Sequence, residues 1–99
     1  MFLDSYKNKI IQLCERYKVE HLFAFGSVIT SKFSDKSDVD FLVNIKLKDP
    51  LKYAENYFDL KFQLEDLLNR KIDLLEEKAI KNSFLKENID NSKLLIYEA

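Results

Sequence analysis

The sequence contains very little glycine, proline and cysteine, and no tryptophan. Its 99 residues include one glycine, one proline and one cysteine. An all-β sandwich needs many tight turns, which glycine and proline supply, so the composition argues against that fold class. The single cysteine, Cys14, cannot form an internal disulfide, which indicates a reducing, cytoplasmic environment. Cys14 also lies on a predicted apolar helix stripe, so we interpret it as a small core residue.

Long apolar runs and an excess of charge of one sign are also absent. No apolar stretch approaches the roughly 18 residues that a bilayer-spanning helix needs, and the first four residues lack a signal-peptide pattern. Sixteen basic and seventeen acidic residues give a net charge of −1. Proteins that grip a long phosphate backbone carry a basic surface instead. We therefore expect neither membrane association nor direct binding of long nucleic acids.

The sequence does contain enough apolar material for one small core. Hydrophobic residues make up 46% of the chain and charged residues 33%, which argues against disorder because apolar burial can offset the entropy of ordering. The length fits a single domain over residues 1–99.

The spacing of apolar residues predicts helices alternating with short strands. Helices are expected over residues 4–18, 49–69 and from 82 or 83 through 89, with a helical turn over 27–31 and a loop over 30–38. Strands are expected over residues 21–25, 39–45, 71–75 and 94–97, the last at an edge. This order predicts an α/β fold with a small sheet flanked by helices, and it leaves the strand directions open. Phe58 and Phe62 either widen the core face of their helix or form an exposed patch.

Two of the predicted strands each carry one acid inside an apolar run, Asp40 and Asp73. An ionised carboxylate in a core is costly unless it is paired or bound to a cation, so each acid either points outward or meets a positive partner. Asp38 lies two positions before Asp40, and residues i and i+2 of a strand project from the same face. Such oxygen ligands suit Mg²⁺ or Mn²⁺. With Asp73 on a neighbouring strand, three carboxylates can hold two ions roughly 3.5–4 Å apart.

A second candidate element is Gly26-Ser27, at the end of the first predicted strand. Glycine permits a positive φ and a close approach of a ligand to the backbone. Ser27 can offer its hydroxyl and N–H to a phosphate at the start of a helical turn. Alone, such a pair is usually an ordinary turn. The informative feature is the combination: Gly26-Ser27, ten residues, then Asp38-Val39-Asp40.

This combination resembles the signature of the DNA polymerase β-like nucleotidyltransferases and, among them, the minimal nucleotidyltransferases (MNT). The matching residues are Gly26-Ser27, then Ser37-Asp38-Val39-Asp40, with Asp73 as the third acid. The resemblance implies the polymerase β-like nucleotidyltransferase fold, a small mixed β-sheet flanked by helices. One departure is clear. Members usually carry arginines after Gly-Ser, whereas this chain has no basic residue between Ser27 and Lys32.

The resemblance also implies a reaction, the transfer of AMP from ATP to an acceptor hydroxyl. Asp38 and Asp40 would hold the metal bound to the triphosphate. Asp73 would help bind a second ion and orient or deprotonate the acceptor. Gly26 and Ser27 would cradle the β- and γ-phosphates. The expected cofactor is Mg²⁺, as two ions, with Mn²⁺ as the alternative.

The acceptor implied by the resemblance is a protein. The MNT group includes antitoxins that add AMP to a tyrosine of a HEPN ribonuclease toxin, so we expect a cytoplasmic protein adenylyltransferase antitoxin with a HEPN-domain partner. Two alternatives stay open. One is a non-catalytic MNT-fold antitoxin that neutralises the toxin by binding alone, and the other is a small-molecule nucleotidyltransferase.

Overall fold

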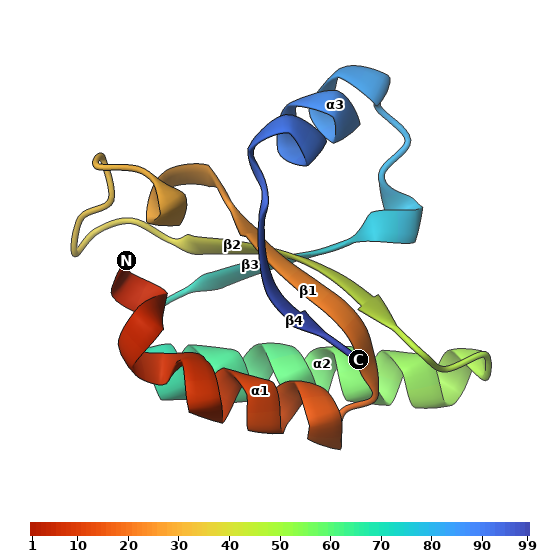
Figure 1. Ribbon diagram of the computed structural model, residues 1–99. Coiled ribbons are helices and arrows are strands. Elements are labelled where there is room, and N and C mark those ends of the chain that lie inside the picture. Colours follow the sequence, from red (N-terminus) through yellow and green to blue (C-terminus); the bar gives the residue numbers. More distant parts are fainter.

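The computed structural model, which describes residues 1–99, is built on one four-stranded sheet (Figure 1). Its strands are β1 (Val19–Phe25), β2 (Val39–Ile45), β3 (Ile72–Glu76) and β4 (Leu94–Glu98). The spatial order is β3-β2-β1-β4. Strand β1 runs antiparallel to both β2 and β4, whereas β2 and β3 are parallel. The expected small mixed sheet with an edge strand at the end of the chain is therefore confirmed, and the structure supplies the directions.

Helices lie on both sides of this sheet. Helices α1 (Lys7–Arg16) and α2 (Pro50–Leu68) lie along one face, and α3 (Ser83–Ser92) stands on the other side (Figure 1). Three short 3₁₀ turns complete the fold: η1 (Phe2–Tyr6), η2 (Gly26–Ile29) and η3 (Glu77–Ala79). The layers are thus two helices, the sheet, and a smaller cover made by α3.

The first helix differs from the prediction of one helix over residues 4–18. A 3₁₀ turn over Phe2–Tyr6 precedes α1, and this tighter turn buries Leu3. Helix α1 ends at Arg16, because Lys18 adopts a left-handed conformation with φ of 63°. That residue turns the chain into β1 two residues earlier than the apolar pattern predicts.

The starts of α2 and α3 agree with the sequence. The Asp49 side chain accepts a hydrogen bond from the Leu51 N–H, with proline at the first helical position. The Asn82 side chain accepts from the N–H groups of Phe84 and Leu85. Each cap satisfies backbone donors that have no partner inside the helix.

The apolar core fills the space between the sheet and helices α1 and α2. Alternate residues of the four strands and one stripe of each helix meet there, including Leu22, Phe41, Val43, Ile72, Leu74, Ile96, Ile10, Cys14, Leu60 and Leu64. Cys14 is fully buried, as interpreted from the sequence, and burial raises the pKa of its thiol to about 12. Since side chains alternate along a strand, the residues between these core positions face the opposite side of the sheet.

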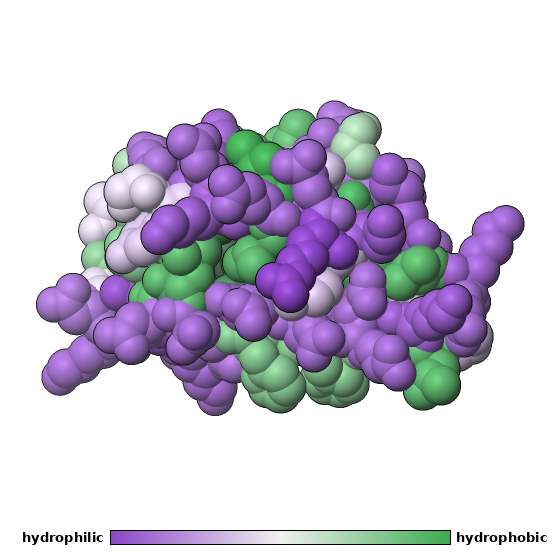
Figure 2. All heavy atoms as spheres, turned by 90° about the horizontal axis from the view of Figure 1, so that it is seen from below, coloured by the Kyte–Doolittle hydropathy of each residue, from purple (hydrophilic) through white to green (hydrophobic).

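The outer surface of α2 carries two exposed aromatic rings, which resolves the alternative left open for them. Phe58 and Phe62 are 53% and 59% exposed, and their ring centroids lie 6.5 Å apart. They therefore form an exposed patch and do not widen the core. Figure 2, viewed from the side of α1 and α2, shows apolar areas interrupted by hydrophilic side chains. No helix combines the length and the hydropathy required to cross a membrane.

Candidate active site

Asp40 and Asp73 lie side by side on the sheet face opposite the core. They are register partners in the parallel pair of β2 and β3. Each is flanked along its strand by core residues, so both carboxylates leave the same face. Asp38 stands just before β2, two positions ahead of Asp40. Asp40 is half-buried, and the other two are exposed.

The three carboxylates are electrostatically coupled through Asp40. Burial raises the pKa of the Asp40 carboxyl above its ordinary value, and the negative charges of Asp73 and Asp38 raise it further. Like charges disfavour each other's ionised forms, and a cation placed between them reverses this effect. The donor chemistry fits Mg²⁺ or Mn²⁺, which prefer carboxylate oxygens.

The free chain does not present a closed metal cage. No group of three or more His, Cys, Asp or Glu side chains is arranged closely enough to hold a metal ion. Asp38 and Asp73 are exposed. To enclose a divalent ion, their carboxylates would have to turn toward Asp40, and the backbone already places Asp40 and Asp73 in register.

Gly26 lies directly against Asp40. Strand β1 ends at Phe25, the register partner of Asp40, and the chain turns at Gly26 with a φ of +74°. A Cβ atom at position 26 would overlap Oδ2 of Asp40. Glycine is thus needed both for the left-handed backbone and for the space that the carboxylate occupies. In the structure the Asp40 side chain makes a close approach to this residue, and the approach of a ligand stays a prediction.

Ser27 follows in the turn η2 and is half-buried. Its carbonyl oxygen accepts hydrogen bonds from the N–H of Thr30, at 2.9 Å, and from the Thr30 hydroxyl, at 2.8 Å. The backbone of Ser27 thus closes the turn, while its hydroxyl lies outside these bonds. The next residue, Val28, is buried in the core. Packing therefore explains why an apolar residue follows Gly-Ser in this chain.

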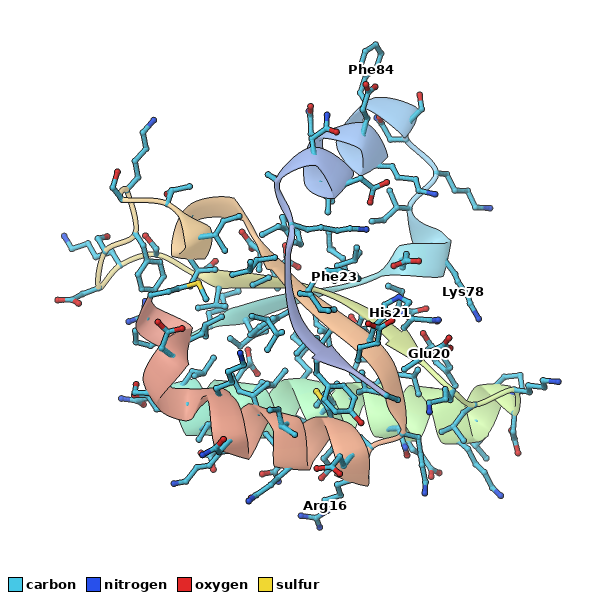
Figure 3. The ribbon with its side chains drawn as sticks, in the orientation of Figure 1. Arg16, Glu20, His21, Phe23, Lys78 and Phe84 are labelled. Carbon is cyan, nitrogen blue, oxygen red and sulfur yellow. The ribbon has the colours of Figure 1, made fainter.

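Farther along the same face, β1 carries Phe23 and His21 (Figure 3). The Nε2 atom of His21 lies 2.9 Å from Oε2 of Glu77 in η3. The Nζ atom of Lys93 lies 4.3 Å from the centroid of the Phe23 ring. These contacts join η3 and the segment after α3 to the sheet. The carboxylate partner of His21 is therefore Glu77, and their contact helps hold η3 against the sheet.

Arg70 is a residue to which the sequence analysis assigns no role. Its guanidinium lies beside the loop that leads to Asp38 and donates to the carbonyl oxygens of Ser34 and Ser37. The sequence holds one weak signal for it. Of sixteen basic residues only Arg16 and Arg70 are arginines, and arginine differs from lysine in offering a planar fork of donors.

Comparison with known proteins points to one family. The family model described as polymerase beta, nucleotidyltransferase matches residues 8–99. A protein of Methanocaldococcus jannaschii, provisionally named a protein adenylyltransferase, is 41% identical over 86 residues. The matched region is 86% of this chain and 82% of that protein.

Solved structures agree with the fold. One, provisionally described as a minimal nucleotidyltransferase, has a TM-score of 0.76 and 26% identity, covering 93% of this chain and 90% of that chain. Another is a complex of a tri-AMPylated Shewanella oneidensis HEPN toxin with an MNT antitoxin. It has a TM-score of 0.68 and 19% identity, covering 100% of this chain and 74% of that chain. At 19% identity, the similarity to this antitoxin supports a shared fold only.

Proposed function

Because the chain belongs to the polymerase beta nucleotidyltransferase family, we propose that it is a protein adenylyltransferase that neutralises a HEPN-domain toxin. It would transfer AMP from ATP to a tyrosine hydroxyl of that toxin. The observation that carries the proposal is the row formed by Asp73, Asp40 and Gly26 across one sheet face. The name of the 41% identical relative supports a protein acceptor. The complex of an MNT antitoxin with an AMPylated HEPN toxin supports the choice of partner.

The order of this row suggests which side of the site meets which reactant. Asp73 lies on the edge strand β3, Asp40 on β2, and Gly26 after β1. We assign the nucleotide to the β1 side, where Gly26 and Ser27 would face the β- and γ-phosphates. The acceptor would approach from the β3 side, where Asp73 is exposed.

We assign Asp38 and Asp40 to the ion bound to the triphosphate and Asp73 to a second ion. Mg²⁺ is the expected metal, with Mn²⁺ as the alternative. Such ions, when bound, neutralise charge on the phosphates and orient the reacting oxygens.

The transfer joins the tyrosine oxygen to the α-phosphorus and breaks the bond to the β-phosphate, which releases pyrophosphate. A free tyrosine titrates near pH 10, so its proton must pass to a base during the attack. Asp73, as the exposed carboxylate on the acceptor side, is the group that we assign to orient the hydroxyl and accept the proton.

One observation favours a second candidate, neutralisation of the toxin by binding alone. The turn after Gly26-Ser27 carries Val28 and Ile29, and both pack in or against the core. It therefore offers no arginine to grip a triphosphate in the bidentate manner.

The decisive experiment is transfer of label from [α-³²P]ATP to a purified HEPN-domain protein offered as the partner. The reaction contains Mg²⁺ and either the wild-type chain, Asp40→Asn or the control Asp59→Asn, which changes an exposed acid on α2. Label on the partner that is lost with EDTA or with Asp40→Asn supports the enzyme. A stable complex that never carries label supports the binding function instead. Intact mass of the partner counts the AMP groups added.

A further inference from the structure

Arg70 connects the two segments that carry the outer carboxylates of the candidate site. Its Nη1 atom donates to the carbonyl oxygens of Ser34, at 3.2 Å, and Ser37, at 2.9 Å. Ser37 directly precedes Asp38, while Arg70 itself lies three residues before Asp73. One side chain therefore reaches from the start of β3 to the end of the loop that leads into β2.

Two aromatic rings hold the guanidinium in place. Its central carbon lies 4.4 Å from the ring centroid of Phe2 and 4.6 Å from that of Phe33, and the two rings are 5.1 Å apart. Phe33 belongs to the same loop as Ser34 and Ser37. Arginine is attracted to the faces of aromatic rings, more strongly where water is excluded. The loop is thus fixed to Arg70 at its middle and at its end.

The backbone around Arg70 is itself well anchored. Helix α2 ends at Leu68, and the C-cap residue Asn69 adopts the left-handed conformation, with φ of 51° and ψ of 46°. The carbonyl oxygen of Lys71 accepts from the N–H of Val39, at 3.2 Å. The N–H of Ile72 donates to Oε2 of Glu65, at 3.3 Å. Arg70 therefore projects from a fixed base.

We propose that Arg70 is a positioning residue, which holds the segment ending in Asp38 close enough to Asp40 and Asp73 for the three carboxylates to share divalent cations. The three like charges repel one another, and the segment from Ser34 to Ser37 is largely exposed. Without the Arg70 contacts, this repulsion would move Asp38 outward. Lysine cannot replace them fully, because a single ammonium lacks the planar fork and the stacking surface. The inference rests on the proposed function, since it concerns metal-binding carboxylates.

The test compares wild type with Arg70→Gln, Arg70→Lys and the control Arg16→Gln. Arg16 lies on α1 and projects away from the sheet (Figure 3), and its guanidinium stacks only on Tyr17, at 5.4 Å. Mn²⁺ binding is measured by electron paramagnetic resonance with a non-hydrolysable ATP analogue present, and amide hydrogen exchange is followed over residues 34–39. We expect Arg70→Gln to weaken Mn²⁺ binding about tenfold, the lower end of the effect of changing the groups that position metal ligands. Exchange should rise over residues 36–39, Arg70→Lys should recover part of the affinity, and Arg16→Gln should match wild type.

The outcomes separate this inference from the proposed function. Equal Mn²⁺ affinity in wild type and Arg70→Gln overturns the inference alone, even if exchange in the loop rises, because Arg70 would then be only structural. A wild-type chain that binds no Mn²⁺ with nucleotide overturns the proposed function and the inference together. If Arg70→Gln does not fold, Arg70→Lys, which keeps the charge and the aliphatic stem, decides by the same comparison.

Discussion

At position 26, both the left-handed backbone conformation and the neighbouring Asp40 side chain require glycine. Gly26→Ala places a methyl group where Oδ2 of Asp40 lies and forces a side chain into the left-handed region. We expect AMP transfer to be lost, because the carboxylate must move. The free energy of unfolding should fall by about 1–2 kcal/mol from the backbone conformation. Label transfer and urea unfolding measure the two effects, with the exposed Ser31→Ala as control. Full activity in Gly26→Ala would contradict the close contact.

The charge of Asp40 should lower the stability of the metal-free protein. Burial and the neighbouring Asp73 and Asp38 raise the pKa of the folded carboxyl above its ordinary value of 3.8. The folded state therefore binds this proton more tightly than the unfolded state, and stability falls as pH rises through the folded pKa. Asp40→Asn removes the charge, so its Tm should exceed that of wild type at pH 7 in EDTA.

Thermal unfolding at pH 7 and at pH 3 checks this prediction. The difference between Asp40→Asn and wild type should shrink below the ordinary carboxyl pKa, where both side chains are neutral. Asp59→Asn, on the exposed face of α2, should show no such pattern. A Tm of Asp40→Asn at or below that of wild type at pH 7 would mean that the carboxylate is not under electrostatic strain.

At the scale of elements, α3 depends on its N-terminal cap more than the better-buried helix α2 does. Only one of its ten residues, Ile89, is buried, so packing contributes little to it. Asn82→Ala removes the acceptor for two N–H groups, 3.0 and 3.1 Å away, which should cost about 1 kcal/mol. Amide exchange should rise throughout α3 and stay unchanged in α2. Asn82→Asp, which keeps an accepting oxygen, should retain protection, and equal exchange in Asn82→Ala and wild type would show that the cap is dispensable.

Local signals in the sequence predicted most elements correctly. Asp49-Pro50 and Asn82 mark the starts of α2 and α3, and apolar runs mark the strands. The early end of the first helix was missed because the left-handed residue after it is Lys18 and not a glycine. The strand directions could not be predicted from the sequence either, because a segment as short as residues 27–38 can connect neighbouring strands that are parallel or antiparallel.

In the candidate site, too, the features with a local sequence signal were predictable and those that depend on tertiary packing were not. The shared face of Asp38 and Asp40 follows from their spacing of two residues. The alignment of Asp73 with Asp40 depends on a parallel register between strands separated by the whole of α2. The contacts of Arg70 with Phe2 and Phe33 join three distant segments. Such long-range pairings follow from tertiary packing and leave no periodic pattern in a single sequence.

For the molecule as a whole, stability depends on one small core. Leu64 of α2 is fully buried, whereas Leu51 of the same helix is 69% exposed. Leu64→Ala should lower the free energy of unfolding by about 2–5 kcal/mol, a large part of the roughly 5–15 kcal/mol typical of a domain. Leu51→Ala should change it by less than about 0.5 kcal/mol. Urea midpoints measure both, and similar losses in the two variants would contradict the assignment of the core.

Cys14 offers a direct measure of opening of that core. It is fully buried, and its pKa of about 12 leaves almost no thiolate at neutral pH. Ellman's reagent should therefore label the native protein slowly and the urea-unfolded protein at once. Labelling should speed up in Leu64→Ala because opening becomes more frequent. Fast labelling of the wild type in native buffer would show that the thiol is accessible.

The carboxylate row and the helices α1 and α2 lie on opposite sides of the sheet. Gln63 lines a groove between α1 and α2, on the helical side. The native thiol, Cys14, is buried. A biotin or fluorophore attached through Gln63→Cys would thus immobilise or label the molecule on its helical side, opposite the carboxylate row. The carboxylate face would stay open to the solution, so the immobilised chain can be used to measure binding of the proposed reactants, ATP and a HEPN-domain protein, on a sensor chip.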